Sequence, residues 1–373
     1  MQSEIGNGRA CAIMVAPGVL GTGMKELTRG GANGYLRIAT EEAFAPPELI
    51  ALYRAALDEP DVDPGFKSLM GFYIGSQEPR PRFIFDRLQD LGELRIADMD
   101  ARGIDRQIIA LTAPGTQILA KDQAVALSVL ANDQLAEACR KYPDRFTGMA
   151  ACAPQDPQHA AREIERAVTK LGMRAVIINS HTHGEYLDHP KFSPLLEAAE
   201  ALDVPIYLHP NTPPRNMIGP MLEAGLDGAI FGFGVETGMH ALRLITTGTL
   251  DRFPRLRVII GHMGEALPFW LYRLDFMHQA GVRAGRYECM KPLEKGTVSN
   301  YLRENFYITN SGMAWEPAIR FTQEVIGVDR VLYAMDYPYQ CPTEEVAALD
   351  AMSLPPEDKK KFFQTNAERV FRL

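Results

Sequence analysis

The sequence has 373 residues, of which 46% are hydrophobic and 23% are charged. This composition is that of a globular protein with a sizeable core, and it excludes a disordered or fibrous chain. With 39 Lys and Arg against 47 Asp and Glu, the formal charge is −8, and no dense basic run occurs. Nucleic acid and anionic membranes are therefore poor partners, and an anionic ligand must be held by local cations.

The five cysteines are far apart and include no C-x-x-C pair. This pattern argues for reduced thiols and a cytoplasmic location, and against a disulfide framework or a thiolate zinc site. The N-terminal apolar run, residues 10–20, is interrupted by Pro17 and Gly18 and is too short to span a bilayer. We expect a flexible leader over residues 1–34, in which Met24 is an alternative native start, followed by one domain over residues 35–373.

From residue 35 onward, short apolar runs alternate with amphipathic segments. The apolar runs predict eight strands, at residues 35–39, 106–111, 146–151, 174–179, 205–208, 257–260, 306–309 and 330–334. Helical patterns fill most of the gaps, at residues 122–142, 157–171, 192–202 and 237–252. Eight apolar strands separated by helices favour a single α/β domain, a (β/α)8 barrel of the TIM type. An open doubly wound sheet is the alternative, but no Gly-rich dinucleotide loop follows the first strand.

Three connections are too long for simple loops, namely residues 59–92, 210–235 and 281–300. Long insertions after the strands of such a barrel lie on its C-terminal, catalytic face, so we expect lids or subunit contacts there. The final segment, residues 355–373, is amphipathic and is expected to pack as a closing helix.

Ionisable side chains stand where predicted strands end. Glu41 and Glu42 follow the first strand, His209 ends the fifth, and Asp336 follows the eighth. Adjacent residues point to opposite faces of a strand, so only one of the two glutamates can face the barrel mouth. Taken alone, both acids could instead cap a helix. Together with His209 and Asp336, one of them would complete a site for a divalent cation of hard to borderline character. His262 lies between glycines and has Glu265 three residues later, a spacing suited to orient its ring.

Four segments together resemble the amidohydrolase superfamily, in the aminocarboxymuconate-semialdehyde decarboxylase-like branch of non-oxidative decarboxylases. They are residues 40–44 (TEEAF), 207–210 (YLHP), 261–265 (GHMGE) and 335–338 (MDYP). The resemblance implies that Glu41, His209 and Asp336 bind one divalent metal ion and that His262 is an active-site group, not a required ligand. Many relatives carry a histidine where this chain has Ala43, and the loss of one imidazole favours Mn2+, with Zn2+ second. No organic cofactor is expected.

The resemblance also implies a phenolic aromatic carboxylate as substrate, with 5-carboxyvanillate from lignin fragments preferred. Arginine can hold a carboxylate in a two-pronged geometry, and Arg80, Arg82 and Arg273 are available, with Arg80 ranked above Arg82. Tyr339 could donate to the substrate carboxylate or close the rim. His181 is a candidate pocket residue, whereas His183, two positions later, is interpreted as structural or exposed.

The expected reaction is decarboxylation, with Asp336 as proton donor to the ring carbon and His262 with Glu265 positioning or deprotonating the phenol. One alternative is a metal-dependent hydrolase of a lactone or amide, although the first-strand H-x-H pair of hydrolytic relatives is missing. The other is a barrel that binds without catalysis. The resemblance further implies a homo-oligomer, dimeric or larger.

Overall fold

The computed structural model describes residues 34–373. Apart from Gly34, the predicted leader and the alternative start at Met24 lie outside these residues. Eight parallel strands form one sheet in sequence order, and each strand pairs with the next. Their bounds are β1 Ile38–Phe44, β2 Arg106–Leu111, β3 Phe146–Ala150, β4 Ala175–Asn179, β5 Ile206–His209, β6 Val258–Ile260, β7 Phe306–Thr309 and β8 Val331–Leu332.

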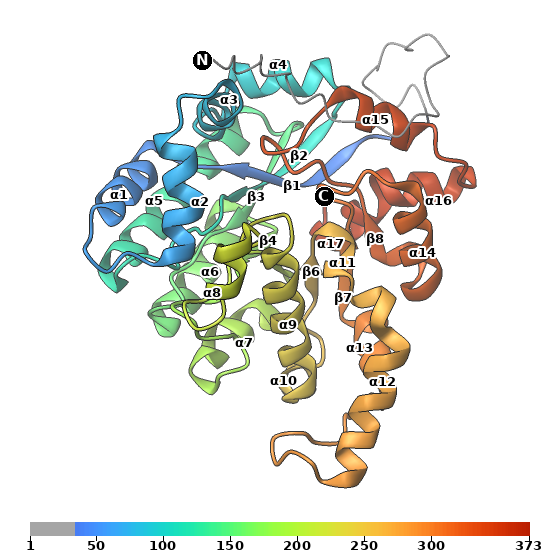
Figure 1. Ribbon diagram of the computed structural model, residues 1–373. Helices are drawn as coiled ribbons and strands as arrows, with labels where there is room; N and C mark the ends of the chain where they lie inside the picture. The colour runs from blue at the N-terminus through green and yellow to red at the C-terminus, as the bar shows by residue number, and fades with distance from the viewer. Residues whose placement is uncertain (1–33) are drawn as a thin grey trace, which may run out of the picture.

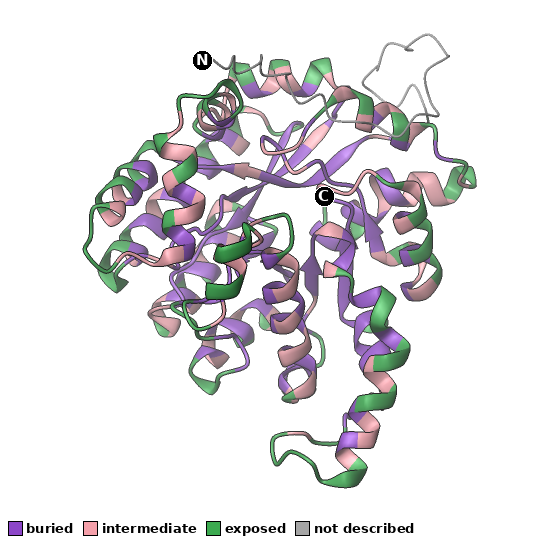
Figure 2. Cartoon of the chain, viewed as in Figure 1, coloured by how far each residue is buried: buried purple, intermediate pink, exposed green. Residues whose placement is uncertain are grey.

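The sheet closes because β1 also bonds to the segment that follows β8. The Thr40 amide donates to the Tyr333 carbonyl at 3.1 Å, and the Ala43 amide donates to the Tyr337 carbonyl at 2.7 Å. Helices surround the strands, and most of the longer ones have one buried and one exposed face (Figures 1 and 2). This arrangement confirms the predicted (β/α)8 barrel, in which the carboxyl ends of all strands share one face.

The helical segments have the following bounds. They are α1 Pro47–Leu57, α2 Pro64–Gly75, α3 Pro79–Leu88, α4 Glu93–Ala101, α5 Lys121–Lys141, α6 Pro157–Leu171, η1 Pro190–Phe192, α7 Ser193–Ala201, α8 Gly219–Ala224, α9 Gly232–Thr246, α10 Thr249–Arg252, α11 His262–Glu265, α12 Leu267–Ala284, α13 Val298–Glu304, α14 Glu316–Ile326, η2 Val328–Arg330, α15 Thr343–Asp350, α16 Pro356–Lys360, η3 Lys361–Thr365 and α17 Asn366–Phe371. Within residues 34–373, none of these helices is long and apolar enough to cross a membrane.

Several predicted boundaries need correction. The first strand is β1 Ile38–Phe44, so Glu41 and Glu42 lie inside a buried strand instead of after it. The insertion at 59–92 contains α2 and α3, because Pro64 and Pro79 occupy first helical positions, where a missing amide N–H breaks no hydrogen bond. The helix predicted at 237–252 is two helices, divided next to Gly248, whose φ is 73°.

The C-terminal segment packs against the barrel as predicted, although as α16, η3 and α17 instead of one helix. Phe362, Phe363, Val370 and Phe371 of this segment are buried, whereas Leu373 is exposed. Phe362 and Phe363 both lie against the ring of Tyr333, just after β8. The closing segment therefore supports the strand end from which Asp336 projects.

Candidate metal centre and active site

The two adjacent glutamates of β1 point in opposite directions, as their alternation in a strand requires. Glu41 faces the barrel axis, where its Oε1 atom lies 3.4 Å from Nε2 of His209 and 3.4 Å from Nε2 of His262. Its Oε2 atom accepts a hydrogen bond from Thr309 at 3.1 Å. Gly261 allows this approach, because a Cβ there would lie 2.6 Å from the same carboxylate.

Both histidines are oriented through their Nδ1 atoms, which leaves Nε2 directed at Glu41. The Nδ1 atom of His209 lies 2.8 Å from the carbonyl of Pro210, and that of His262 lies 2.8 Å from Oε1 of Glu265. A carbonyl or carboxylate partner on one ring nitrogen is the usual arrangement for a metal-binding histidine, because it fixes the tautomer and leaves the other nitrogen free as a ligand.

His262 and Glu265 are brought together by a left-handed turn of the backbone. All five residues from His262 to Ala266 have positive φ values between 50° and 72°, and only Gly264 among them is glycine. The left-handed conformation costs about 1–2 kcal/mol for each non-glycine residue. Strain of this kind is found where the surrounding structure imposes it, most often at functional sites.

Asp336 completes the centre from the segment after β8. Its φ is 71°, another left-handed value at a non-glycine residue. Ligand atoms of Glu41, His262 and Asp336 all lie within 4.8 Å of one another. Burial and the nearby Glu41 carboxylate raise the pKa of Asp336 to about 7, against the opposing effect of His262 and His209. A carboxyl group with this pKa can carry a proton near neutral pH.

The charges of the centre depend on one another. Burial alone would raise the pKa of Glu41, but the two imidazoles outweigh it and hold that pKa below its usual value. Burial lowers the pKa of His262, but Glu41 and Glu265 outweigh it and raise the pKa to about 10. Four ionisable groups that face one another in this way are typical of a functional site.

The donor set fits a divalent cation. Oε1 of Glu41 is buried and accepts no hydrogen bond, which is costly unless another positive group satisfies it. Two carboxylates and two imidazoles suit a cation of hard to borderline character, such as Mn2+ or Zn2+. The ligand atoms that lie together come from Glu41, His262 and Asp336, so His262 takes the place that the sequence prediction gave to His209. His209 lies beside this group, 3.4 Å from Glu41.

Two of the predicted substrate-binding residues, Arg80 and Tyr339, lie together at the rim. The Arg80 guanidinium donates to the Tyr339 carbonyl at 3.1 Å. The Tyr339 hydroxyl lies 2.6 Å from the hydroxyl of Thr112, and its ring packs edge-on against Tyr73 at 5.4 Å. Sequence reasoning did not find Thr112 or Tyr73, because neither belongs to a motif and only the fold brings them to Tyr339.

The other predicted substrate-binding residues lie elsewhere. Arg82 and Arg273 are exposed. Among the described residues 34–373, no hydrogen bond or ion pair joins either arginine to Glu41, His209, His262 or Asp336. His181 is buried with both ring nitrogens engaged, Nδ1 with the Gly184 amide and Nε2 with the Thr212 carbonyl. It lines a separate cavity of about 590 Å³ together with Asp63 and Arg215. The geometry thus gives no support to a substrate contact by His181.

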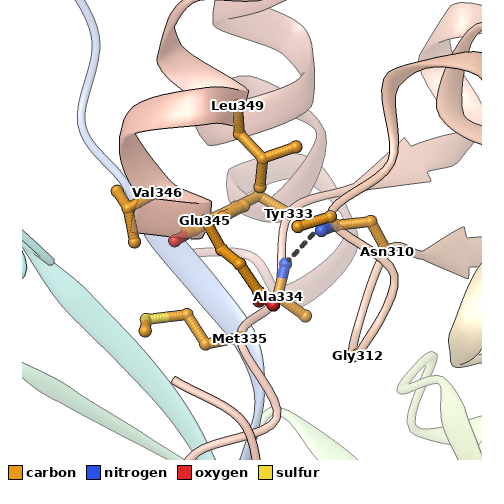
Figure 3. A pocket seen from close by; sticks show the side chains of 9 residues that line it. Asn310, Gly312, Tyr333, Ala334, Met335, Glu345, Val346 and Leu349 are labelled. Atoms are coloured by element: carbon orange, nitrogen blue, oxygen red, sulfur yellow. Dashed lines mark hydrogen bonds between the residues drawn. The ribbon is translucent and has the colours of Figure 1, made fainter. Parts of the chain in front are cut away.

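A much smaller pocket lies behind the segment that carries Asp336 (Figure 3). Its volume is about 10 Å³, enough for a single water molecule and too small for an aromatic acid. Asn310, Met335 and Glu345 are among its lining residues. The Asn310 side chain accepts a hydrogen bond from the Ala334 amide at 3.0 Å, which fixes the backbone just before Asp336.

Comparisons with known proteins identify relatives that cover nearly the whole chain. γ-Resorcylate decarboxylase of Rhizobium sp. (strain MTP-10005) is 35% identical over 345 residues, which cover 90% of this chain and 98% of that protein. A crystal structure of 5-carboxyvanillate decarboxylase from Novosphingobium aromaticivorans, with manganese and 4-hydroxy-3-methoxy-5-nitrobenzoic acid, is 59% identical with a TM-score of 0.93. It covers 94% of this chain and 100% of its own.

A crystal structure of 2,6-dihydroxybenzoate decarboxylase with 2,6-dihydroxybenzoate is 33% identical with a TM-score of 0.78, and covers 91% of this chain and all of its own. The family model described as amidohydrolase matches residues 83–373. This match covers most of the barrel, including His209, His262 and Asp336, and the relatives extend it over β1 and Glu41. The chain belongs to the amidohydrolase family.

Proposed function

We propose that this protein is a metal-dependent, non-oxidative decarboxylase of phenolic aromatic carboxylates. The observation that carries the proposal is the position of Asp336, a carboxyl group whose ligand atom lies within 4.8 Å of those of Glu41 and His262. A group that can be protonated at the metal centre can deliver a proton to carbon. The relatives support the same reaction, because those compared above are named as decarboxylases of hydroxylated aromatic acids.

Glu41, His209 and Asp336 would hold the metal ion, with His262 facing the same point. We propose Mn2+, because the donors are oxygen and imidazole nitrogen and because the 59% identical structure contains manganese. When bound, the ion supplies a positive charge that polarises the phenol and carboxylate oxygens of the substrate and stabilises negative charge on them.

The residues of the chain would then act in sequence. His262, held by Glu265 and protonated near neutral pH, would position the phenol oxygen and stabilise negative charge on it, so that electron density rises on the ring carbon that bears the carboxylate. Asp336 donates its proton to that carbon, which breaks the aromaticity of the ring. The carbon–carbon bond to the carboxylate then breaks, CO2 leaves, and the electron pair restores the aromatic ring. Each turnover consumes one proton, so Asp336 must be protonated again from solvent.

We propose 5-carboxyvanillate as the substrate and the catabolism of lignin fragments as the setting. The support is the 59% identity to an enzyme of that name, whose structure holds a nitro-substituted 4-hydroxy-3-methoxybenzoic acid. Arg80 and Tyr339 at the rim would hold a carboxylate of the substrate.

The decisive experiment offers Mn2+-loaded protein 5-carboxyvanillate, γ-resorcylate and 2,3-dihydroxybenzoate and follows CO2 release. We expect release from the first of these, and loss of the reaction in the Asp336→Asn variant with metal content retained. If no acid is decarboxylated, the proposal fails and hydrolysis of lactones and amides becomes the assay of choice. A protein that binds no divalent ion on reconstitution would point to a barrel without this catalysis.

We also propose that the protein forms a homo-oligomer in the cytoplasm. Helix α12 exposes Phe269, Trp270, Tyr272 and Phe276, with exposed fractions of 74%, 49%, 85% and 56%. Such an aromatic face on one helix is unusual for a monomer and suits contact with a second copy. Replacing Trp270 by Glu should lower the mass measured by light scattering.

The proposed cytoplasmic location is supported by the cysteines. Cys139, Cys152, Cys289 and Cys341 are free thiols, which is typical of a reducing compartment.

A further inference from the structure

Glu42, the neighbour of the metal-facing Glu41, is buried and has no place in the reaction described above. Its exposed fraction is 1%, and its side chain points away from the centre, towards the segment that follows β8. Oε1 of Glu42 accepts a hydrogen bond from the Met335 amide at 3.0 Å. Oε2 accepts one from the Tyr337 amide at 3.2 Å. One carboxylate therefore bonds to the residues on both sides of Asp336.

The geometry of the barrel closure explains why these two amides need a side-chain partner. The two hydrogen bonds that close the barrel join Thr40 to Tyr333 and Ala43 to Tyr337. Between these bonds β1 advances by three residues, whereas the segment after β8 advances by four. The extra residue makes a bulge, at which the Met335 amide has no backbone partner among residues 34–373, and the two chains pair again at Glu42 and Tyr337. Asp336 lies in this bulge, and its left-handed φ of 71° belongs to the same distortion.

The Glu42 carboxyl group is linked to a buried arginine through one intervening side chain. Arg95 is fully buried, and Gln107 bridges the two groups, since its Oε1 accepts from Arg95 at 3.2 Å and its Nε2 donates to Glu42 at 3.4 Å. The Arg95 guanidinium also lies 4.7 Å from the centre of the Tyr337 ring. Burial raises the pKa of Glu42 well above its usual value, against the opposing effect of the Met335 amide and Arg95. A buried network that is fully hydrogen-bonded fixes the groups that it contains.

We propose that Glu42 is a positioning residue that holds the bulge in which Asp336 is presented to the metal and to the substrate. The two adjacent glutamates thus have separate tasks, Glu41 at the metal and Glu42 on the backbone of Asp336. Without the carboxylate, the Met335 and Tyr337 amides lose their acceptors, and the strained left-handed conformation of Asp336 loses what keeps it in place. The structural role of Glu42 does not depend on the proposed function. Only the expected effect of Glu42 on catalysis rests on it.

The test compares Glu42→Gln with Glu163→Gln, a matched control in the outer helix α6. Glu163 is also buried and hydrogen-bonded, in its case to Arg166 and to the side-chain amide of Asn132. In the Glu42 variant only one oxygen remains to serve two amides. We expect faster hydrogen–deuterium exchange in peptides covering residues 331–340, about 10- to 100-fold weaker Mn2+ binding and a kcat reduced by a similar factor, with a much smaller change in KM. The Glu163 variant should change thermal stability alone.

A double-variant cycle in Mn2+ affinity separates this role from a general loss of structure. If Glu42 acts through Asp336, Glu42→Gln should not weaken binding further in a chain that already carries Asp336→Asn. Unchanged exchange at residues 331–340, or a full additional loss of affinity in the double variant, would overturn the inference. Should Glu42→Gln not fold, Glu42→Asp keeps the charge and tests the same exchange and affinity. Hydrogen–deuterium exchange and Mn2+ affinity are measured without turnover. They therefore test the role of Glu42 even if the protein does not catalyse the proposed decarboxylation.

Discussion

Replacing Gly234 by alanine should lower catalysis without lowering stability. Gly234 lies near the start of α9, which packs against the left-handed turn that carries His262 and Glu265. A Cβ at this position would lie 3.0 Å from Oε2 of Glu265, closer than a relaxed contact allows. The flexible carboxylate must therefore move by a few tenths of an ångström. Its other oxygen holds Nδ1 of His262 at 2.8 Å, so the movement disturbs the orientation of that ring.

The size of the effect follows from the bond that is disturbed. A hydrogen bond to a charged group contributes about 1.5–3 kcal/mol. If the contribution is lost in the transition state, the rate falls by about 10- to 100-fold, since about 1.4 kcal/mol corresponds to a factor of ten. An alanine favours a helix over glycine by up to about 1 kcal/mol, so the free energy of unfolding should stay equal or rise.

The control is Gly238→Ala, one turn later on the same helix. Its Cβ would meet the backbone oxygen of Glu265 at 3.4 Å and the Cβ of Glu265 at 3.6 Å, close to ordinary contacts that leave the carboxylate in place. Steady-state kinetics of CO2 release and thermal unfolding would be measured for both variants. If Gly234→Ala were as active as Gly238→Ala, or if both variants lost activity only in proportion to lost stability, the reasoning would be refuted.

Three further predictions concern metal, substrate and pH. Removal of divalent ions by a chelator should lower Tm, and Mn2+ should restore it. A ligand at 100 times its Kd raises the free energy of unfolding by about 2.7 kcal/mol. An unchanged Tm in calorimetry would count against a metal centre. Arg80→Lys should raise KM about 10-fold with kcat nearly kept, because lysine cannot grip a carboxylate with two donors, while Arg82→Lys should match the unchanged protein in the same assay. Burial raises the pKa of Glu236 from 4.5 to about 8, so its contribution to stability is complete below about pH 4.5 and is lost as pH rises through 8. Glu236→Gln should therefore show a shallower fall of Tm between pH 5 and 8, and an unchanged slope would contradict this assignment.

The sequence by itself predicted the barrel and most of its strands. Strands buried on both faces must be apolar throughout, so they appear as short continuous runs, and seven of the eight agree closely with the observed bounds. The ionisable residues at strand ends were visible for the same reason, because a charge next to a buried run has few structural explanations. Parallel strands of a barrel all end on one face, and this rule placed one of the two glutamates together with His209 and Asp336. The family resemblance then selected Glu41.

Only the tertiary structure decided how those groups are aimed. The left-handed turn at His262 and the bulge at Asp336 are conformations that local sequence disfavours, so no propensity rule could predict them. They exist because residues distant in the chain hold them. Glu42 illustrates this difference, since an acid next to another acid on a strand resembles a helix cap until its partners, Met335 and Tyr337, are seen about 290 residues later. The local sequence pattern thus determined which residues meet. Long-range hydrogen bonds determined the geometry in which they meet.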